Sequence, residues 1–357
     1  MKTLIHIISA VSLVGALLAG CTSTENQEEI SGVLTGEEIT IDDDFDGGII
    51  RKVISDTIYA ETYGPRYFHQ MAVVSFDTLT SIGRFSRKGQ GPGEFIQQVS
   101  LGVRNNIPYV IGKRNGTVQA AKINTVDPDG NPTMYPPMSM QDVSAYSYAF
   151  IVDDDSTFLF LVAPWEDPEN LFGRYNYNTG AFTPLVYWPD DGFTGPSHSK
   201  YRFYADNSKL KTNHAGKYFY SLANGRKAFI FSIRNDSVII EHTIYDYPVS
   251  YSADDDGLNY SYDYSGHEFS VDSNDSIIVF LHRALTAEGR EPGPSEFGQY
   301  GNRISVWDWD GKLIGSYELD HLVYGIYVNS SDNSFYARMS DKQTGDDLMW
   351  RYRIDNR

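Results

Sequence analysis

The stretch "GIYVNSSDNSFYARM", residues 325–339, decides the fold. A short apolar strand is followed by a tight turn of Asn, Ser and Asp, and then by a second strand rich in aromatic residues. This order is typical of a β-hairpin, because Asn, Asp and Ser favour turns whereas aromatic and β-branched residues favour strands. Since the chain is long for one ordinary domain, internal copies of this unit have to be sought first.

Five further copies of the hairpin precede it. They are "IIRKVISDTIYAE" (49–61), "SLGVRNNIPYVIG" (100–112), "AFIVDDDSTFLFLV" (149–162), "LKTNHAGKYFYSLA" (210–223) and "EFSVDSNDSIIVFL" (268–281). Successive copies are spaced by 51, 49, 60, 59 and 58 residues, measured between the anchors Ile58, Tyr109, Phe158, Tyr218, Ile277 and Phe335. The chain therefore contains six units.

A second hairpin follows each of the first five copies, as a four-stranded sheet requires. Examples are "AFIFSIRNDSVIIEHTI" (228–244) and "ISVWDWDGKLIGSYEL" (304–319), in which Asn-Asp and Asp-Gly pairs separate the strands. The sixth copy is followed only by "LMWRYRI" (348–354), so it lacks one strand. The unpartnered strand "EEITID" (37–42) supplies it if residues 37–42 pair with Met349–Ile354.

These observations predict an all-β fold over residues 37–357, a six-bladed β-propeller of four-stranded antiparallel blades. The N-terminal strand is expected to close the ring by pairing into the last blade. Apolar residues do not recur at the helical period over a dozen positions anywhere in the chain, which argues against a helical fold. A β-sandwich or a β-helix is the alternative, because the six copies are degenerate in sequence.

Residues 1–20 read as a secretory signal peptide, with Lys2 before an apolar run that is too short to span a membrane stably. The run ends in "LAGC", which resembles the lipobox of bacterial lipoproteins. Cys21 is the only cysteine of the chain, and this resemblance implies that it is acylated and becomes the first mature residue. The lipid bilayer, reached through acylated Cys21, is therefore an expected partner.

Residues 21–36 are polar and acidic, and we expect them to form a disordered tether. Gln27, Glu28 and Glu29 resemble the acidic signals that direct lipoproteins of Bacteroidetes to the cell surface. No later window is apolar enough to cross a bilayer. The expected location is the outer membrane, on the periplasmic side or exposed at the surface.

With the repeat and the anchor in place, the chain resembles a known family, the six-bladed, TolB-like β-propeller lipoproteins of Bacteroidetes. The resemblance is carried by "IGRFSRKGQGPGEF" (82–95) and by "VWDWDGKLIGSYELDHLVYGIYVNSSDNSFYARMSD" (306–341). It implies the propeller fold and an envelope address. It implies no activity, because none is generally established for the family.

The charge balance argues against polyanionic partners. The chain carries 29 basic and 47 acidic residues, a formal charge of −18, so nucleic acid and anionic membrane faces repel it. No cofactor is predicted except a possible calcium ion. Asp42, Asp44 and Asp46 in "DDDFDGG" (42–48) match the first half of an EF-hand-like loop, but Val53 stands where that loop ends in Glu. A simple acidic turn is the favoured interpretation.

The candidate ligand-binding residues lie near the ends of expected strands. Arg87, Lys88 and Glu94 belong to the glycine-rich "RKGQGPGEF" segment, which leads from an outer strand to the next inner strand and is expected near the mouth of the central channel. His267 begins an inner strand, and Arg283 follows the second strand of the same unit. None of the histidines has metal-ligand spacing, and no nucleophile motif is present, so no catalytic residue is assigned.

We therefore expect a noncatalytic binding or interaction module for an envelope protein or a glycan. Loops rich in aromatic residues, such as "LVYWPDDGF" (185–193), offer flat apolar faces beside acids and favour a sugar or peptide ligand. Two alternatives stay open. One is a propeller enzyme, a metal-dependent lyase or hydrolase acting at the channel mouth; the other is a structural subunit of an outer-membrane complex.

Overall fold

The computed structural model describes residues 29–354 except 47, 106, 115–116, 125–131, 137, 140–142, 165–169, 206–207, 223–226, 247–250, 255–256, 261–267, 283–299 and 341–346. Its elements are β-strands and one short helix, α1 (Ser197–Ala205), within these ranges. No helix in this part of the chain is long and apolar enough to cross a membrane. The predicted all-β fold is confirmed.

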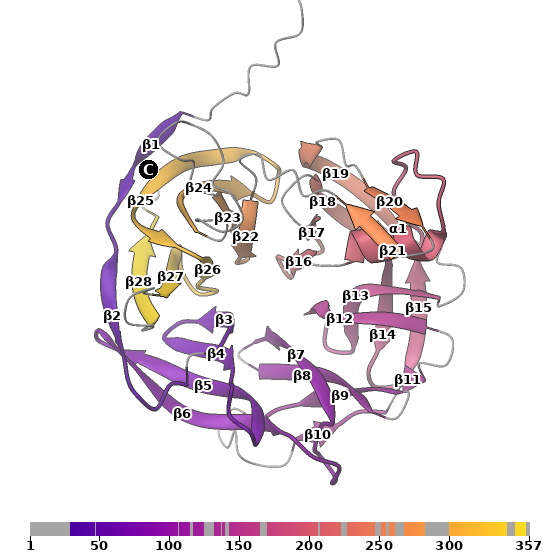
Figure 1. Ribbon diagram of the computed structural model, residues 1–357, viewed down its shortest axis with the longest axis horizontal. Helices are drawn as coiled ribbons and strands as arrows, with labels where there is room; N and C mark the ends of the chain where they lie inside the picture. The colour runs from indigo at the N-terminus through magenta and orange to yellow at the C-terminus, as the bar shows by residue number, and fades with distance from the viewer. Residues whose placement is uncertain are drawn as a thin grey trace, which may run out of the picture.

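The strands form antiparallel sheets arranged around a central axis, as Figure 1 shows. The first of three consecutive sheets contains β7 (Gln97–Arg104), β8 (Ile107–Arg114) and β9 (Thr117–Lys122), with the short strands β10 (Thr133–Met134) and β11 (Met138–Ser139) paired to β9. The second contains β12 (Val143–Val152), β13 (Thr157–Pro164), β14 (Phe172–Asn176) and β15 (Ala181–Leu185). The third contains β16 (Lys209–Thr212), β17 (Tyr218–Ser221), β18 (Lys227–Arg234) and β19 (Ser237–Asp246). A fourth contains β22 (Glu268–Ser273), β23 (Ile277–His282), β24 (Gly301–Asp308), β25 (Leu313–Val323) and β1 (Ile30–Leu34). A small hairpin, β20 (Tyr251–Asp254) and β21 (Gly257–Tyr260), stands apart from these sheets.

The remaining eight strands form one sheet, so the described residues do not form the six separate sheets expected from the repeat. It joins β3 (Ile50–Ile54), β4 (Thr57–Glu61), β5 (Tyr67–Ser75) and β6 (Thr78–Arg87) to β26 (Gly325–Val328), β27 (Ser334–Ser340), β28 (Asp347–Arg353) and β2 (Glu37–Ile41). The join consists of two parallel residue pairs between β2 and β6. The two edges of the sheet also meet, through an isolated bridge between Val53 and Asn329, so the sheet is nearly closed.

The repeat explains where the core lies. All six repeat anchors are buried on the second strand of a four-strand set: Ile58, Tyr109, Phe158, Tyr218, Ile277 and Phe335. Aromatic rings fill the wedge between neighbouring sheets; those of Tyr109 and Phe158, for example, meet edge to face at 6.0 Å. The innermost strands contact one another in the closed order β3, β7, β12, β16, β22, β26 and back to β3. The propeller arrangement of antiparallel sheets is therefore confirmed.

The two ends of the ring differ in their connections. In the first strand set, the turn at 55–56 lies at one end of the strands, while the connections at 62–66 and 88–95 lie at the other. We name these ends the turn face and the loop face. The hydroxyls of Ser55 and Ser331 are 2.8 Å apart, which places the turn of the last hairpin on the turn face as well.

The N-terminal strand joins the last strand, as the sequence predicts. Strand β2 pairs antiparallel with β28, and Ile39 lies opposite Met349 with both side chains buried. At the surface, the guanidinium of Arg351 donates two hydrogen bonds to Glu37, at 3.0 and 2.6 Å. Strand β2, on the outer side of the ring in Figure 1, thereby shares one sheet with β28, the last strand of the described chain.

The predicted disordered tether, residues 21–36, overlaps a strand near its C-terminal end. Its last part forms β1, which runs parallel to β25 at the rim. Gly36 then passes so close to the ring of Tyr352 that a Cβ would lie 2.8 Å from it, and its backbone N–H contacts the carboxylate of Asp320 at 3.2 Å. The polar residues that make up most of 21–36 hide the apolar Ile30, Val33 and Leu34 of this strand, so the average composition does not reveal its pairing.

Replacing Ile39 with Ala should lower the free energy of unfolding by about 3 kcal/mol, because the cavity would open between the first and last strands of the ring. Chemical denaturation of the purified chain measures this loss. Thr40→Ala is the matched control, since Thr40 is the exposed neighbour on the same strand. Equal effects of the two substitutions would contradict closure through β2.

Candidate functional site

Three charged side chains from three sheets meet near the ring axis. The ammonium of Lys211 on β16 bonds to the carboxylate of Asp272 on β22, whose second oxygen accepts the backbone N–H of Val328 at 2.8 Å. Lys52 on β3 reaches the same strand and donates to the carbonyl of Ser273 at 3.0 Å. We call Lys52, Lys211 and Asp272 the axial charge cluster.

Burial and neighbouring charges shift the pKa values of Asp272 and Lys52 in the axial charge cluster. Burial by itself raises the pKa of Asp272, but the charges of Lys211 and Lys52, together with its hydrogen bonds, hold that pKa below the usual value. Burial lowers the pKa of Lys52; Asp272 and Asp275 oppose this effect, and Lys211 adds to it. Because the pKa of Asp272 is lowered in the fold, its stabilising effect is complete at neutral pH and is lost only as the pH falls through that lowered value.

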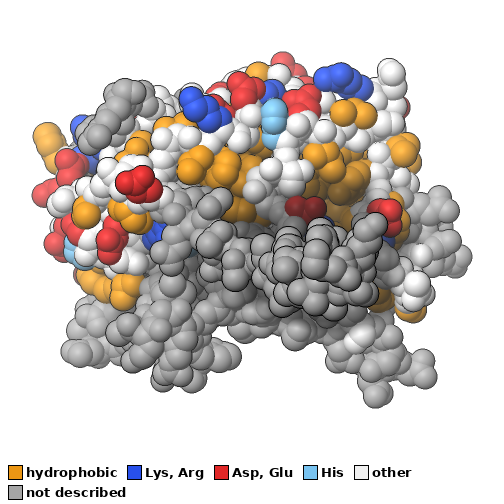
Figure 2. Space-filling model, turned by 90° about the horizontal axis from the view of Figure 1, so that it is seen from above, with side chains coloured by type: hydrophobic (Ala, Val, Ile, Leu, Met, Phe, Trp, Pro, Cys, Tyr) orange, Lys and Arg blue, Asp and Glu red, His pale blue; other side chains and the backbone are white. Residues whose placement is uncertain are grey.

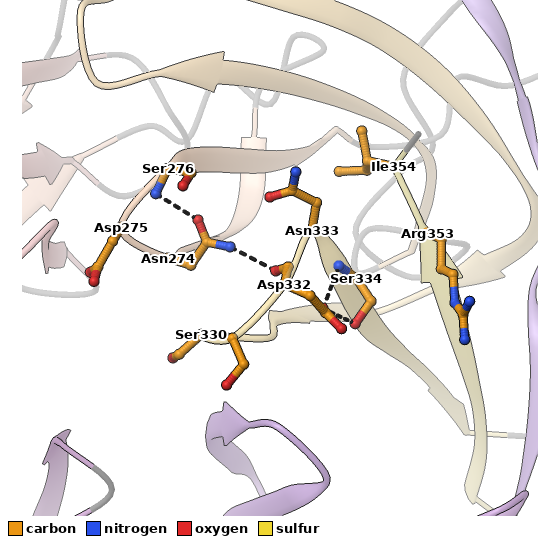
Figure 3. A pocket seen from close by; sticks show the side chains of 10 residues that line it. Asn274, Asp275, Ser276, Ser330, Asp332, Asn333, Ser334, Arg353 and Ile354 are labelled. Carbon is orange, nitrogen blue, oxygen red and sulfur yellow. Dashed lines mark hydrogen bonds between the residues drawn. The ribbon is translucent and has the colours of Figure 1, made fainter. Parts of the chain in front are cut away.

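A pocket of about 620 Å³ opens on the turn face, and Figure 3 shows the side chains that line it. Its lining comes from the turns that follow β22 and β26 and from the end of the chain: Asn274, Asp275, Ser276, Ser330, Ser331, Asp332, Asn333, Ser334, Arg353 and Ile354. We call it the turn pocket. The lining is rich in hydroxyl, carboxamide and carboxylate groups, with one guanidinium.

Hydrogen bonds between the two turns hold the turn pocket in shape. The side-chain amide of Asn274 donates to the carbonyls of Asn329 and Asp332, at 3.1 and 2.8 Å, and its oxygen accepts the backbone N–H of Ser276 at 2.8 Å. The carboxylate of Asp332 accepts the backbone N–H of Ser334 at 2.8 Å. These bonds fix the backbone of both turns, while the side chains of Asp275, Ser276 and Ser331 belong to exposed residues.

The glycine-rich segment, residues 87–95, forms a closed loop on the loop face. The backbone N–H of Gly89 donates to the carbonyl of Phe95 at 3.0 Å, and the carboxylate of Glu94 folds back to accept the N–H of Gly91 at 2.8 Å. A Cβ on Gly89 would lie 2.1 Å from that carboxylate, and one on Gly91 would lie 2.9 Å away. The glycines therefore make room for Glu94, which has a structural role here.

Arg87 and Lys88 stand at the end of β6, the outermost strand of its set. The guanidinium of Arg87 lies 5.9 Å from the centre of the Tyr67 ring. The ammonium of Lys88 donates to the carbonyl of Gly64 at 2.8 Å and lies 4.9 Å from the centre of the Phe68 ring. The structure thus places them on the loop face, on a rim strand, whereas the axial charge cluster extends from innermost strands. Their role in ligand binding stays a prediction.

The acidic stretch proposed for calcium makes local contacts. Asp46 accepts hydrogen bonds from the hydroxyl of Thr62 and, at 2.8 Å, from the amide of Gln70, while Asp42 accepts the backbone N–H of Asp44 at 3.3 Å. Across the described ranges, no three His, Cys, Asp or Glu side chains are grouped as metal ligands. These contacts are those of an acidic turn, and calcium binding by Asp42, Asp44 and Asp46 stays a prediction.

Three other candidates, Cys21, His267 and Arg283, lie outside the described residues, and their roles stay predictions. The described histidine next to Arg283 has a local partner. His282 ends β23, and its Nε2 is 2.8 Å from the hydroxyl of Ser305 on the neighbouring strand.

The aromatic loop at 185–193 packs within the molecule. Phe193 stacks on Tyr251 with ring centres 4.4 Å apart, and the ammonium of Lys200 on α1 lies 5.4 Å from the Trp188 ring centre. These contacts attach α1 and the β20–β21 hairpin to the rim. The sequence-based interpretation of this loop as a ligand surface is therefore weakened, because these rings already have partners.

Sequence reasoning missed the axial charge cluster. Lys52, Lys211 and Asp272 each interrupt an inner strand, five to seven residues before the repeat anchor of their unit. Aligning the six copies for charges at this offset would have marked them. The turn pocket is harder to recognise from its sequence pattern, because Asn, Asp and Ser are common in all tight turns.

Charges elsewhere on the surface are mixed. On the face drawn in Figure 2, acidic and basic side chains are interspersed along the upper rim, with hydrophobic side chains between and below them. Ion pairs such as Arg51–Glu61, at 2.5 Å, and Arg234–Glu241, at 3.2 Å, contribute to this mixture.

No protein-family model matches the chain, and no curated protein matches it in sequence. Solved structures resemble it. A protein of Bacteroides fragilis NCTC 9343, described as exported, superposes with a TM-score of 0.51 at 13% identity, covering 90% of this chain and 96% of that one. At this identity the likeness shows the fold alone.

Two further structures are more distant, and no argument rests on them. A protein of unknown function from Bacteroides thetaiotaomicron VPI-5482 has a TM-score of 0.43 at 13% identity, over 89% of this chain and 75% of that one. An oligogalacturonate lyase in complex with manganese has a TM-score of 0.44 at 10% identity, over 90% and 96%.

Gly89→Ala and Glu94→Ala should each lower the free energy of unfolding by about 1–2 kcal/mol, because either change removes the charged hydrogen bond to Gly91. The double variant should lose little more than one single variant, as one interaction is removed in all three. Denaturant unfolding measures the cycle. Gly32→Ala is the control, since a Cβ there meets nothing within 4 Å; additive losses would contradict this role of Glu94.

Proposed function

We propose that the protein is a six-bladed β-propeller in which the eight-stranded sheet serves as two blades. Two observations support this count. Strands β3–β6 and β26, β27, β28, β2 are two antiparallel sets of four, joined by only two parallel residue pairs. The innermost strands, in addition, contact one another in a closed cycle of six.

We infer that this ring is a noncatalytic binding module for a protein or glycan of the cell envelope, and that the turn pocket is its binding site. The observation that carries this inference is the set of hydrogen bonds that fixes the two turns before any ligand arrives. A preformed site loses little conformational entropy on binding, which favours affinity.

The lining favours a glycan over a peptide. Sugar hydroxyls both donate and accept hydrogen bonds, and the turn pocket offers Ser hydroxyls, Asn amides and Asp carboxylates for both roles. Apolar peptide side chains would find little, since Ile354 is the one aliphatic residue of the lining and is itself buried. A protein ligand would therefore have to bind through polar groups.

We propose that the module belongs to the TolB-like lipoproteins of Bacteroidetes and is anchored in the outer membrane through acylated Cys21. The "LAGC" motif and the glycine-rich segment support this proposal. The likeness in fold to a Bacteroides fragilis protein described as exported is consistent with it. The ring would then present the turn pocket to envelope glycans or proteins.

Ser276→Trp should abolish retention of the ligand, because an indole at this position fills the turn pocket while the backbone bonds of the turn stay intact. A glycan array and a pull-down from envelope extract, run with the full mature chain, identify the ligand and measure its retention. Ser75→Trp is the control, since it adds the same ring at an exposed site on the turn face, near the rim. Equal retention by both variants, or no ligand in either assay, would overturn the proposed function.

Cys21→Ala should move the protein from the membrane fraction to the aqueous fraction of fractionated cells, because the acyl chains supply the anchoring energy. Immunoblotting of both fractions measures the change. Thr22→Ala, one residue further on, is the control and should leave the protein in the membrane fraction. Membrane retention of the Cys21 variant would refute the anchor.

A further inference from the structure

Lys52 differs from two other lysines with a largely buried carboxylate beside them, Lys211 and Lys200, in having no carboxylate in contact among the described residues. Its ammonium carries three donors, and its one hydrogen bond among the described residues is to the carbonyl of Ser273 at 3.0 Å. Lys211, by contrast, contacts the carboxylate of Asp272, and Lys200 contacts that of Asp191 at 2.9 Å.

The carboxylates near Lys52 already have partners. Asp272 bonds to Lys211 and to the backbone N–H of Val328. Asp275 lies 2.8 Å from Nδ1 of His214, and 62% of its side chain is exposed. A partly buried ammonium that lacks a paired anion is costly, and a bound anion would remove that cost. Burial accordingly lowers the pKa of Lys52 in the free protein.

Lys52 is linked to the lining of the turn pocket through its neighbours in the chain. The residue after it, Val53, accepts the backbone N–H of Ser330 in the pocket lining at 3.0 Å. Its acceptor, Ser273, directly precedes Asn274 of the same lining. Lys52 is half-buried, and Lys211 retains 23% of its side-chain surface, so both cations keep access to solvent. A ligand that reaches both the turn pocket and these two cations would carry its anionic group toward the axis.

We propose that the axial charge cluster binds a carboxylate of the ligand, between the ammonium groups of Lys52 and Lys211. This inference rests on the proposed function of the turn pocket and narrows its ligand to an acidic glycan. A single negative charge fits the site better than a phosphate, because the carboxylate of Asp272, which contacts Lys211, opposes a group of nearly two negative charges.

The test compares D-glucuronate with neutral D-glucose and with inorganic phosphate, as sodium salts at equal ionic strength, by calorimetric titration of the full mature chain. We expect measurable affinity for glucuronate, and at least about tenfold weaker binding of glucose and phosphate. Lys52→Gln should weaken glucuronate binding by about tenfold or more, because it removes the unpaired cation. Lys312→Gln, at an exposed lysine of the β24–β25 turn, is the matched control and should bind as the parent chain does.

Lys52→Gln should fold, since it removes a charge that burial disfavours; Lys52→Met provides a second variant with a stem of similar length. Equal binding of glucose and glucuronate, preferential binding of phosphate, or unchanged glucuronate affinity in both Lys52 variants would overturn the proposal. The proposed function fails separately. If Ser276→Trp abolishes ligand retention while Lys52→Gln leaves it unchanged, the turn pocket stands as the binding site and only the carboxylate site is refuted.

Discussion

The backbone pairing of β2 with β28 is the constraint on which the ring depends. Three residue pairs, the last of them the buried pair of Ile39 and Met349, hold segments from near the two ends of the described chain. Without this pairing, β28 would present an open edge, and open edges recruit other strands. The same strand also bridges to β6, so one short segment connects the first and last strand sets. Every inner strand, and therefore the axial charge cluster, keeps its place because the ring is closed.

Much of this architecture could be predicted from the sequence, for a physical reason. Each unit must bury an aromatic or aliphatic second strand against its neighbours, so residues such as Phe158 and Phe335 recur at a regular spacing. The pairing of the N-terminal strand with the last unit could be predicted because that unit has one strand fewer than the others. The merging of two strand sets into one sheet could not be predicted, because it depends on two backbone pairs between β2 and β6 that leave no mark on side-chain pattern. Strand β1 escaped notice for the same reason, since its polar surroundings resemble a tether.

The candidate site was harder to predict than the fold. Glycines and charges in "RKGQGPGEF" drew attention to a ligand role, but Glu94 uses its carboxylate to close its own loop, and Lys88 bonds to the carbonyl of Gly64. Conversely, Lys52 and Asp272 looked ordinary, because a single charge in a strand says nothing about which distant strand it will face. Only the ring brings β3, β16 and β22 together. The unusual residues of the glycine-rich segment form a tight local loop. The better candidate site is the axial charge cluster, which ordinary residues from three sheets form.

The position of β1 has a mechanical consequence. It lies parallel along β25 at the rim, and Gly36 links it to the strand that seals the ring. A pull applied to the chain before residue 30 must first strip β1 from its neighbour, and only then does tension reach the seal. Strand β1 therefore shields the pairing of β2 with β28 from a force that acts on the N-terminal end of the chain.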